Sequence, residues 1–133
     1  MSVYRIHIRP KGGKANPDAS FAYCLKKQVL GLGWQTKSQI SGASWDAYEK
    51  EAKKIHGADQ LSRVRFLKDK INPNDLIWTR DTKGCYYLAK VISGWEYYTN
   101  HEAQDADITN VVRCKIIKVE SVCDVPGKVI ACF

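Results

Sequence analysis

The sequence predicts an α+β fold, a small twisted β-barrel of about five to six strands flanked by two to three helices. Two observations favour this class. The predicted elements run in the order strand, helix, strand, two helices and then about four consecutive strands. The central strand segments are also fairly apolar on both faces, as in a small barrel. With 133 residues and 44% hydrophobic composition, residues 1–133 are expected to form a single domain.

The first elements are predicted from periodicity and capping signals. Residues 3–9 alternate between apolar and basic side chains, which is the period of a half-buried strand. Asn16, Pro17 and Asp18 form a helix-start signal, and Phe21 follows on the apolar face of a short helix. Residues 29–34 are too short and too rich in glycine for a helix, so they are predicted as a buried strand.

Two further helices and a hairpin are expected next. Ser44 can cap a helix that carries Trp45 and Tyr48 on one face and ends at Gly57. Asp59 can cap a second helix that runs to about Lys70. After a turn at residues 71–75, residues 74–98 read as a hairpin. Its own turn lies at residues 81–84, and Gly94 is placed at a bulge. The remainder is predicted as a polar loop at 99–109 and strands at 111–117 and 129–133.

The hairpin is the stretch that points most strongly to a function. It contains two of the four Trp and four of the seven Tyr residues, together with Arg80, Lys83 and Lys90. Flat rings beside cations suit nucleobases and phosphates.

Charge distribution supports an acidic partner. The net charge is +7, and nucleic acid is the commonest acidic partner of a small basic domain. Four basic residues precede the first acidic one, Asp18, and are the candidate phosphate contacts: Arg5, Arg9, Lys11 and Lys14. Between Lys90 and Arg113 the charged residues are all acidic. One surface is therefore expected to be basic and another acidic.

The sequence argues against several other classes of protein. The five cysteines are widely spaced without a CxxC pair, so neither a disulfide framework nor a zinc site is signalled, and no cofactor or metal is expected. The N-terminus reads as a strand, and no apolar run approaches the roughly 18 residues that span a bilayer. A cytoplasmic location without a membrane partner is the expectation.

Four short motifs carry a resemblance to a known family. They are Gly31-Leu32-Gly33-Trp34, Asn72-Pro73-Asn74-Asp75-Leu76-Ile77-Trp78, Tyr87-Leu88-Ala89-Lys90-Val91 and Val111-Val112-Arg113, with Trp45 opening the helix between the first two. Over roughly residues 20–120 the chain resembles the PUA-like superfamily, especially EVE and YTH-type domains and the N-terminal modules of modification-dependent restriction proteins. It departs from the pattern at Asn74, where a glycine is usual, and in the acidic segment 99–109.

The resemblance implies a nucleic-acid-binding module that recognises a modified or flipped-out base through an aromatic cage, in a defence system against foreign DNA. The candidate base-binding residues are Trp34, Trp78, Trp95, Tyr97, Asp75, Arg80 and Asn110. Two of them have equally simple structural interpretations: Trp78 is flanked by Leu76 and Ile77 as in a core strand, and Asp75 can cap the turn before it.

An enzymatic role is not expected. A restriction-type nuclease would need a second carboxylate near Lys90, and none of the three histidines stands in a recognisable nucleophile motif. Two alternatives stay open. One is a phage- or host-encoded protein-binding regulator or inhibitor that uses the same fold. The other is an RNA-associated PUA-like module, although DNA is favoured over RNA.

Overall fold

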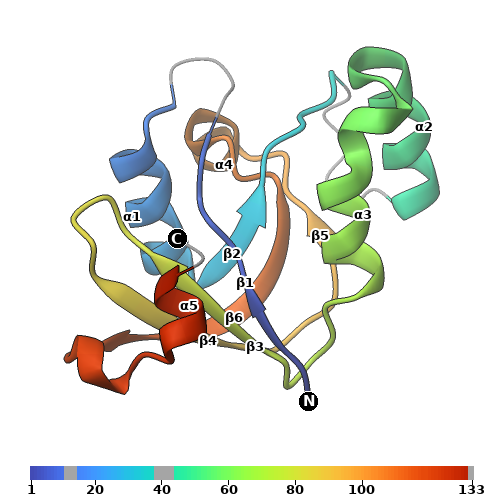
Figure 1. Cartoon of the computed structure of the whole chain (residues 1–133). Helices are drawn as coiled ribbons and strands as arrows, with labels where there is room; N and C mark the ends of the chain where they lie inside the picture. The colour runs from blue at the N-terminus through green and yellow to red at the C-terminus, as the bar shows by residue number, and fades with distance from the viewer. Residues whose placement is uncertain (11–14, 38–43, 132–133) are drawn as a thin grey trace.

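A computed structural model describes residues 1–10, 15–37 and 44–131 (Figure 1). The elements are β1 (Val3–Arg5), α1 (Pro17–Lys27), β2 (Val29–Leu32), α2 (Trp45–His56), η1 (Ala58–Leu61), α3 (Ser62–Asp69), β3 (Leu76–Arg80), β4 (Tyr86–Val91), β5 (Glu96–Tyr97), α4 (His101–Ala106), β6 (Asn110–Val119), η2 (Val122–Asp124) and α5 (Gly127–Ala131). No described helix has both the length and the apolar character that crossing a membrane requires.

The six strands form one mixed sheet with the order β1-β3-β4-β6-β2, and β5 pairs with β6. β1 is parallel to β3, and the other pairs are antiparallel. Asn110 at the start of β6 pairs with Leu32 of β2 and with Tyr97 of β5. The α+β class is confirmed. The predicted barrel is not, because the sheet stays open: β1 and β2 are its end strands and do not pair with each other within the described residues.

The first two predicted helices are confirmed with their caps. The Asn16 side chain accepts a hydrogen bond from the Ala19 backbone N–H, and Pro17 occupies the first turn of α1. The Ser44 hydroxyl accepts from the Ala47 N–H at the start of α2, which ends at Gly57 with φ of 88°. In Figure 1, α2 and α3 lie together on the right of the molecule, and α1 lies on the left.

The predicted second helix, from Asp59 to about Lys70, is divided. Residues 58–61 form the tighter helical turn η1, and α3 begins only at Ser62, so Asp59 does not cap it. Gly57 precedes η1 instead and accepts, through its carbonyl, a hydrogen bond from the Gln60 N–H.

Two other predictions about local structure are wrong. The predicted loop 99–109 contains α4, which the Asn100 side chain caps by accepting from the Ala103 N–H. The sequence of this segment is mostly polar because the helix buries only two alanines, Ala103 and Ala106, so no apolar periodicity marks it. The predicted strand 129–133 is helical as far as Ala131, and residues 132–133 lie outside the described part of the chain. The Pro126 carbonyl accepts from the N–H groups of Val129 and Ile130, which starts a helical turn.

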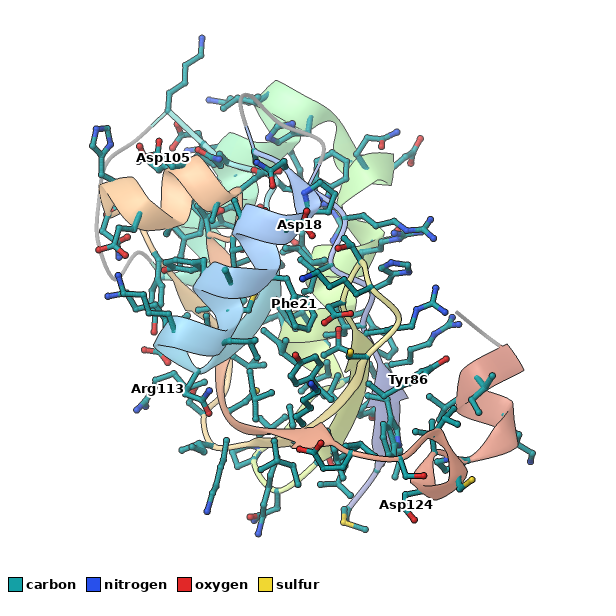
Figure 2. All side chains as sticks on the ribbon, turned by 90° about the vertical axis from the view of Figure 1, so that its left-hand side faces the viewer. Asp18, Phe21, Tyr86, Asp105, Arg113 and Asp124 are labelled. Carbon is teal, nitrogen blue, oxygen red and sulfur yellow. The ribbon has the colours of Figure 1, made fainter. Side chains whose placement is uncertain are left out.

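Apolar side chains gather in three clusters. The largest joins α1, α4 and the sheet through fully buried residues such as Leu30, Ile77 and Val112. A second lies under α2 and α3 and is centred on Tyr48. The third, with Trp78 and Tyr86, lies on the other face of the β3–β4 hairpin beneath the C-terminal segment. Figure 2 shows Tyr86 toward that segment, away from Asp105 of α4.

The close approach of β2 and β6 gives a prediction about Gly31. A Cβ atom at Gly31 would lie 2.0 Å from the backbone oxygen of Asn110. Because backbone cannot yield as a flexible side chain can, Gly31→Ala is expected to lower the free energy of unfolding by about 3 kcal/mol. Denaturant unfolding measures this. Gly94→Ala, whose Cβ would meet no atom within 4 Å, is the control and should change stability by less than about 1 kcal/mol. If Gly31→Ala and Gly94→Ala lowered the free energy of unfolding equally, the close approach at Gly31 would not be what makes a side chain there destabilising.

Candidate functional site

A cleft of about 800 Å³ opens between the two end strands of the sheet. On one side lie the residues that follow β1, and on another the residues at the end of β2. The start of α3, the end of α2 and α4 complete it. The residues that line the cleft include His7, Arg9, Gly33, Trp34, Gln35, His56, Asp59, Arg63, Gln104, Asp105 and Asp107. The volume lies within the range of about 300–1,000 Å³ that is typical of small-molecule sites.

Trp34 lines this cleft from an unusual backbone conformation. Its φ is 55°, in the left-handed region that a residue with a bulky side chain seldom adopts. The Gly33 carbonyl accepts from the Asn110 Nδ2 at 2.6 Å and from the Thr109 hydroxyl at 3.0 Å. The Trp34 carbonyl accepts from the Tyr48 hydroxyl at 2.8 Å. The surrounding side chains therefore hold the backbone at Trp34, which lines the cleft and also packs against the Tyr48 cluster.

The next two residues are held in the same way. The Gln35 carbonyl accepts from His56 Nε2 at 2.7 Å, so this ring nitrogen carries a proton. The Gln35 side chain donates to the Gln104 carbonyl and to the Asp107 carboxylate, each at 2.9 Å. The Thr36 N–H donates to the Tyr97 hydroxyl. Residues 33–36 form a wall whose position depends on side chains from α2, α4, β5 and β6.

Asn110 is the centre of this arrangement. It is fully buried, and its Nδ2 donates to the Gly33 carbonyl and, at 3.0 Å, to the Tyr48 hydroxyl. Its Oδ1 accepts from Trp95 Nε1 at 2.9 Å. Because every polar atom of its side chain has a protein partner, Asn110 is not placed to read the edge of a ligand. It supports the site rather than contacting what the cleft holds.

Aromatic rings pack behind the wall. Trp95 and Tyr97 lie 5.8 and 4.8 Å from Tyr48 between ring centroids, and Trp45 packs edge-on against Trp95. Neither Trp95 nor Tyr97 lines the cleft. The Trp34 ring is 5.3 Å from His56 in an edge-on contact. Thus four predicted base-binding residues, Trp34, Trp95, Tyr97 and Asn110, do converge, but Trp34 alone of the four faces the open space.

The other three predicted base-binding residues lie elsewhere. Trp78 is 7% exposed in the cluster beneath the C-terminal segment. The Arg80 guanidinium lies 5.9 Å from the ring centroid of Tyr86 in the same region. The Asp75 carboxylate accepts from the N–H groups of Ser2 and Asn72, which lowers its pKa, so it caps the turn. Neither Trp78 nor Arg80 lines the cleft.

One of the predicted phosphate contacts, Arg9, lines the cleft, and Arg5 lines a smaller cavity beside it together with Arg9. Lys11 and Lys14 fall outside the described residues. Arg63 of α3, which was not among the predicted contacts, lines both cavities.

The two walls of the cleft differ in charge. His7, Arg9 and Arg63 occupy one side, whereas the carboxylates lie on η1 and α4, as Asp59, Asp105 and Asp107. Figure 2 places Asp105 on α4. The segment predicted to be acidic therefore meets the basic N-terminal strand across one cleft, and the two do not form separate surfaces. A ligand that carries both an anionic group and hydrogen-bond donors would match this arrangement.

Sequence reasoning missed three contributors to the site. Tyr48 was assigned to an apolar helix face, and its hydroxyl was not considered. His56 and Gln35 had no predicted role in the site. The signal for Tyr48 was available, since a buried tyrosine hydroxyl needs a partner. No local signal marks Gln35 or His56.

Comparison of the chain with protein-family models, with curated proteins and with solved structures gives no match. The similarity of the four motifs to PUA-like domains therefore stays a prediction.

The buried amide of Asn110 leads to a stability prediction. Asn110→Ala removes three hydrogen bonds and should lower the free energy of unfolding by about 3 kcal/mol. The exposed Asn72→Ala is the control, with an expected loss below about 1 kcal/mol. In a double-mutant cycle with Tyr48→Phe, the two losses should be coupled by about 1 kcal/mol because the residues share a hydrogen bond. Strict additivity in denaturant unfolding would contradict the network.

His7 gives a prediction about pH. Burial lowers the pKa of His7 below the ordinary value of 6.5, and the nearby guanidiniums of Arg9, Arg80 and Arg5 lower it further. The folded protein then binds the proton less readily than the unfolded chain. The contribution of neutral His7 to the free energy of unfolding is fully present above about pH 6.5. It is lost as the pH falls through the pKa of His7 in the folded state. Between about pH 7.5 and about pH 5 the free energy of unfolding should decrease less for His7→Gln than for the parent protein, as measured by denaturant unfolding at both pH values. His101→Gln, on the exposed surface of α4, controls for the loss of an imidazole.

Proposed function

We propose that the protein is a nucleic-acid-binding module whose cleft accepts a single base, extruded from a duplex or presented by a single strand. The supporting observation is Trp34, which is held by side-chain hydrogen bonds in a left-handed conformation and lines a cleft bordered by Arg9 and Arg63. Stacking of a base on an aromatic ring stabilises such complexes by about 1–3 kcal/mol per base. The guanidiniums provide contacts for the phosphates on either side.

This proposal differs from a four-ring cage. The base would stack on Trp34, while Trp95 and Tyr97 hold the wall from behind through Asn110 and Thr36. The polar groups that line the cleft include the carboxylate of Asp105. It lies on α4, where it could meet the hydrogen-bonding edge of a base.

Trp34 supplies the most direct test. Binding of fluorescently labelled single-stranded oligonucleotides, DNA first and then RNA, with and without modified bases, is measured by anisotropy at low salt. Trp34→Ala should weaken binding by about 5- to 150-fold, which corresponds to the loss of one stacked base. Trp78→Phe, on the far face of the hairpin, should leave the affinity unchanged. A circular dichroism melt confirms that both variants fold.

Failure of every oligonucleotide to bind the parent protein would overturn the proposal. If both tryptophan variants retain the parent affinity, the ligand does not stack at Trp34 and the cleft assignment is wrong. Recovery of one specific protein partner, with an affinity that Trp34→Ala leaves unchanged, would support the protein-binding alternative instead.

The salt dependence tests the phosphate contacts separately. The logarithm of the binding constant for single strands falls with the logarithm of salt concentration by about 0.7 for each phosphate contacted. Arg9→Gln should reduce this slope by about one contact for all base sequences alike. Lys115→Gln, on the exposed face of β6 and away from the cleft, should leave the slope unchanged. An unchanged slope for Arg9→Gln would exclude this contact.

A further inference from the structure

A second, smaller cavity of about 340 Å³ adjoins the cleft. The two share four lining residues, His7, Arg9, Leu32 and Arg63. The small cavity is thus a lateral extension of the cleft beside the end of β1 and the residues that follow it. Its volume also lies at the lower end of the range found for ligand sites.

The smaller cavity combines an apolar floor with an exposed ring. Ile6, Leu32 and the buried Leu67 contribute aliphatic surface. Phe66 completes it and is 43% exposed, and it is the only aromatic residue in the described ranges 1–10, 15–37 and 44–131 that is classed as exposed. Folding normally covers much more of a phenylalanine ring. Because it lies in a concavity, the Phe66 ring offers a flat surface on which a base can stack.

The Phe66 ring is also held in place. Tyr4 packs against it edge-on, with 5.3 Å between ring centroids and an angle of 89° between planes. The Tyr4 hydroxyl donates in turn to the Lys70 carbonyl at 3.0 Å. Because Tyr4 presents an edge contact and is itself anchored, the Phe66 ring is ordered before any ligand arrives, which reduces the entropy cost of stacking.

The charges around this cavity differ from those of the cleft. Arg5, His7, Arg9 and Arg63 line it, and none of the described residues that line it is acidic. The carboxylates of Asp59, Asp105 and Asp107 line only the larger cleft. Arg9 and Arg63 thus line both the cavity that contains Phe66 and the cleft that contains Trp34. A phosphodiester that links two nucleotides carries its negative charge between their two bases, so one such phosphate could contact the shared cations.

We propose that the smaller cavity is a second nucleotide subsite, in which the base next to the one in the cleft stacks on Phe66 while the phosphate between them lies against Arg9 and Arg63. The proposal rests on the proposed function of the cleft and adds to it the length of the ligand: two consecutive nucleotides, the second read by stacking without selection among bases.

Dinucleotides with and without the second base test the subsite. Isothermal titration at low salt compares an intact DNA dinucleotide with its two abasic versions, one lacking the 5′ base and one lacking the 3′ base. One abasic version should bind more weakly because it leaves the cleft empty, and the other because it leaves the Phe66 subsite empty. The version that leaves the Phe66 subsite empty should bind about 5- to 150-fold more weakly than the intact dinucleotide.

Phe66→Ala identifies which loss belongs to the subsite. The variant should bind the intact dinucleotide only as tightly as the parent binds the abasic dinucleotide that leaves the subsite empty. For that abasic dinucleotide, the variant and the parent should have the same affinity. Trp34→Ala should show the opposite pattern. Ile117→Ala removes an exposed side chain from β6, which lines neither cavity, and should match the parent throughout.

The outcomes separate the two proposals. Equal affinity of the parent for the intact dinucleotide and for one abasic version would overturn the second subsite and leave the cleft in place. A Phe66→Ala variant that weakens intact and abasic ligands equally would also overturn it, since the ring would then act through the fold. No binding of any of the three dinucleotides by the parent would overturn both the subsite and the function proposed for the cleft.

Discussion

The candidate site depends on the hydrogen bonds of the Asn110 side-chain amide. It is fully buried and bonds to three segments that are distant in the sequence: the end of β2 at Gly33, helix α2 at Tyr48, and the segment before β5 at Trp95. A buried amide left without partners costs about 1–3 kcal/mol for each unsatisfied group. Moving any one of these segments away from Asn110 would therefore destabilise the folded state. The conformation of Trp34 follows, because the same network fixes the carbonyls of Gly33 and Trp34.

The open sheet has a functional consequence. If β1 and β2 were paired, their backbone groups would close the barrel and leave no room between them. Instead β1 pairs with β3 and β2 with β6, and the two end strands flank the space that Trp34, Arg9 and Arg63 line. α3 approaches the same space and contributes Arg63, Phe66 and Leu67 to its smaller part. The cleft is thus a result of the sheet topology, with its walls supplied by helices.

Local signals predicted the elements that depend on local interactions. The caps at Asn16 and Ser44 and the turn at residues 81–84 were recognised because their hydrogen bonds join residues close in sequence. α4 was missed because its buried side chains are alanines and its other residues are polar. α5 was missed because apolar residues after a Pro-Gly pair fit a strand and a short helix equally well. Phe66 received no role, since the pattern of α3 assigns Leu61, Val64 and Leu67 to the core.

The sequence by itself determined the α+β composition, the basic N-terminal strand, the helix caps and the concentration of aromatic residues near the hairpin. Only the tertiary structure decided which of those rings meet. Trp34, Trp95 and Tyr97 come together with Asn110, whereas Trp78 lies in a separate cluster beneath the C-terminal segment. Side-chain alternation is visible in a strand, but the element that covers each face is set by contacts between residues far apart in the chain. For the same reason no local pattern could show that Trp34 lines the cleft and that Trp95 and Tyr97 do not.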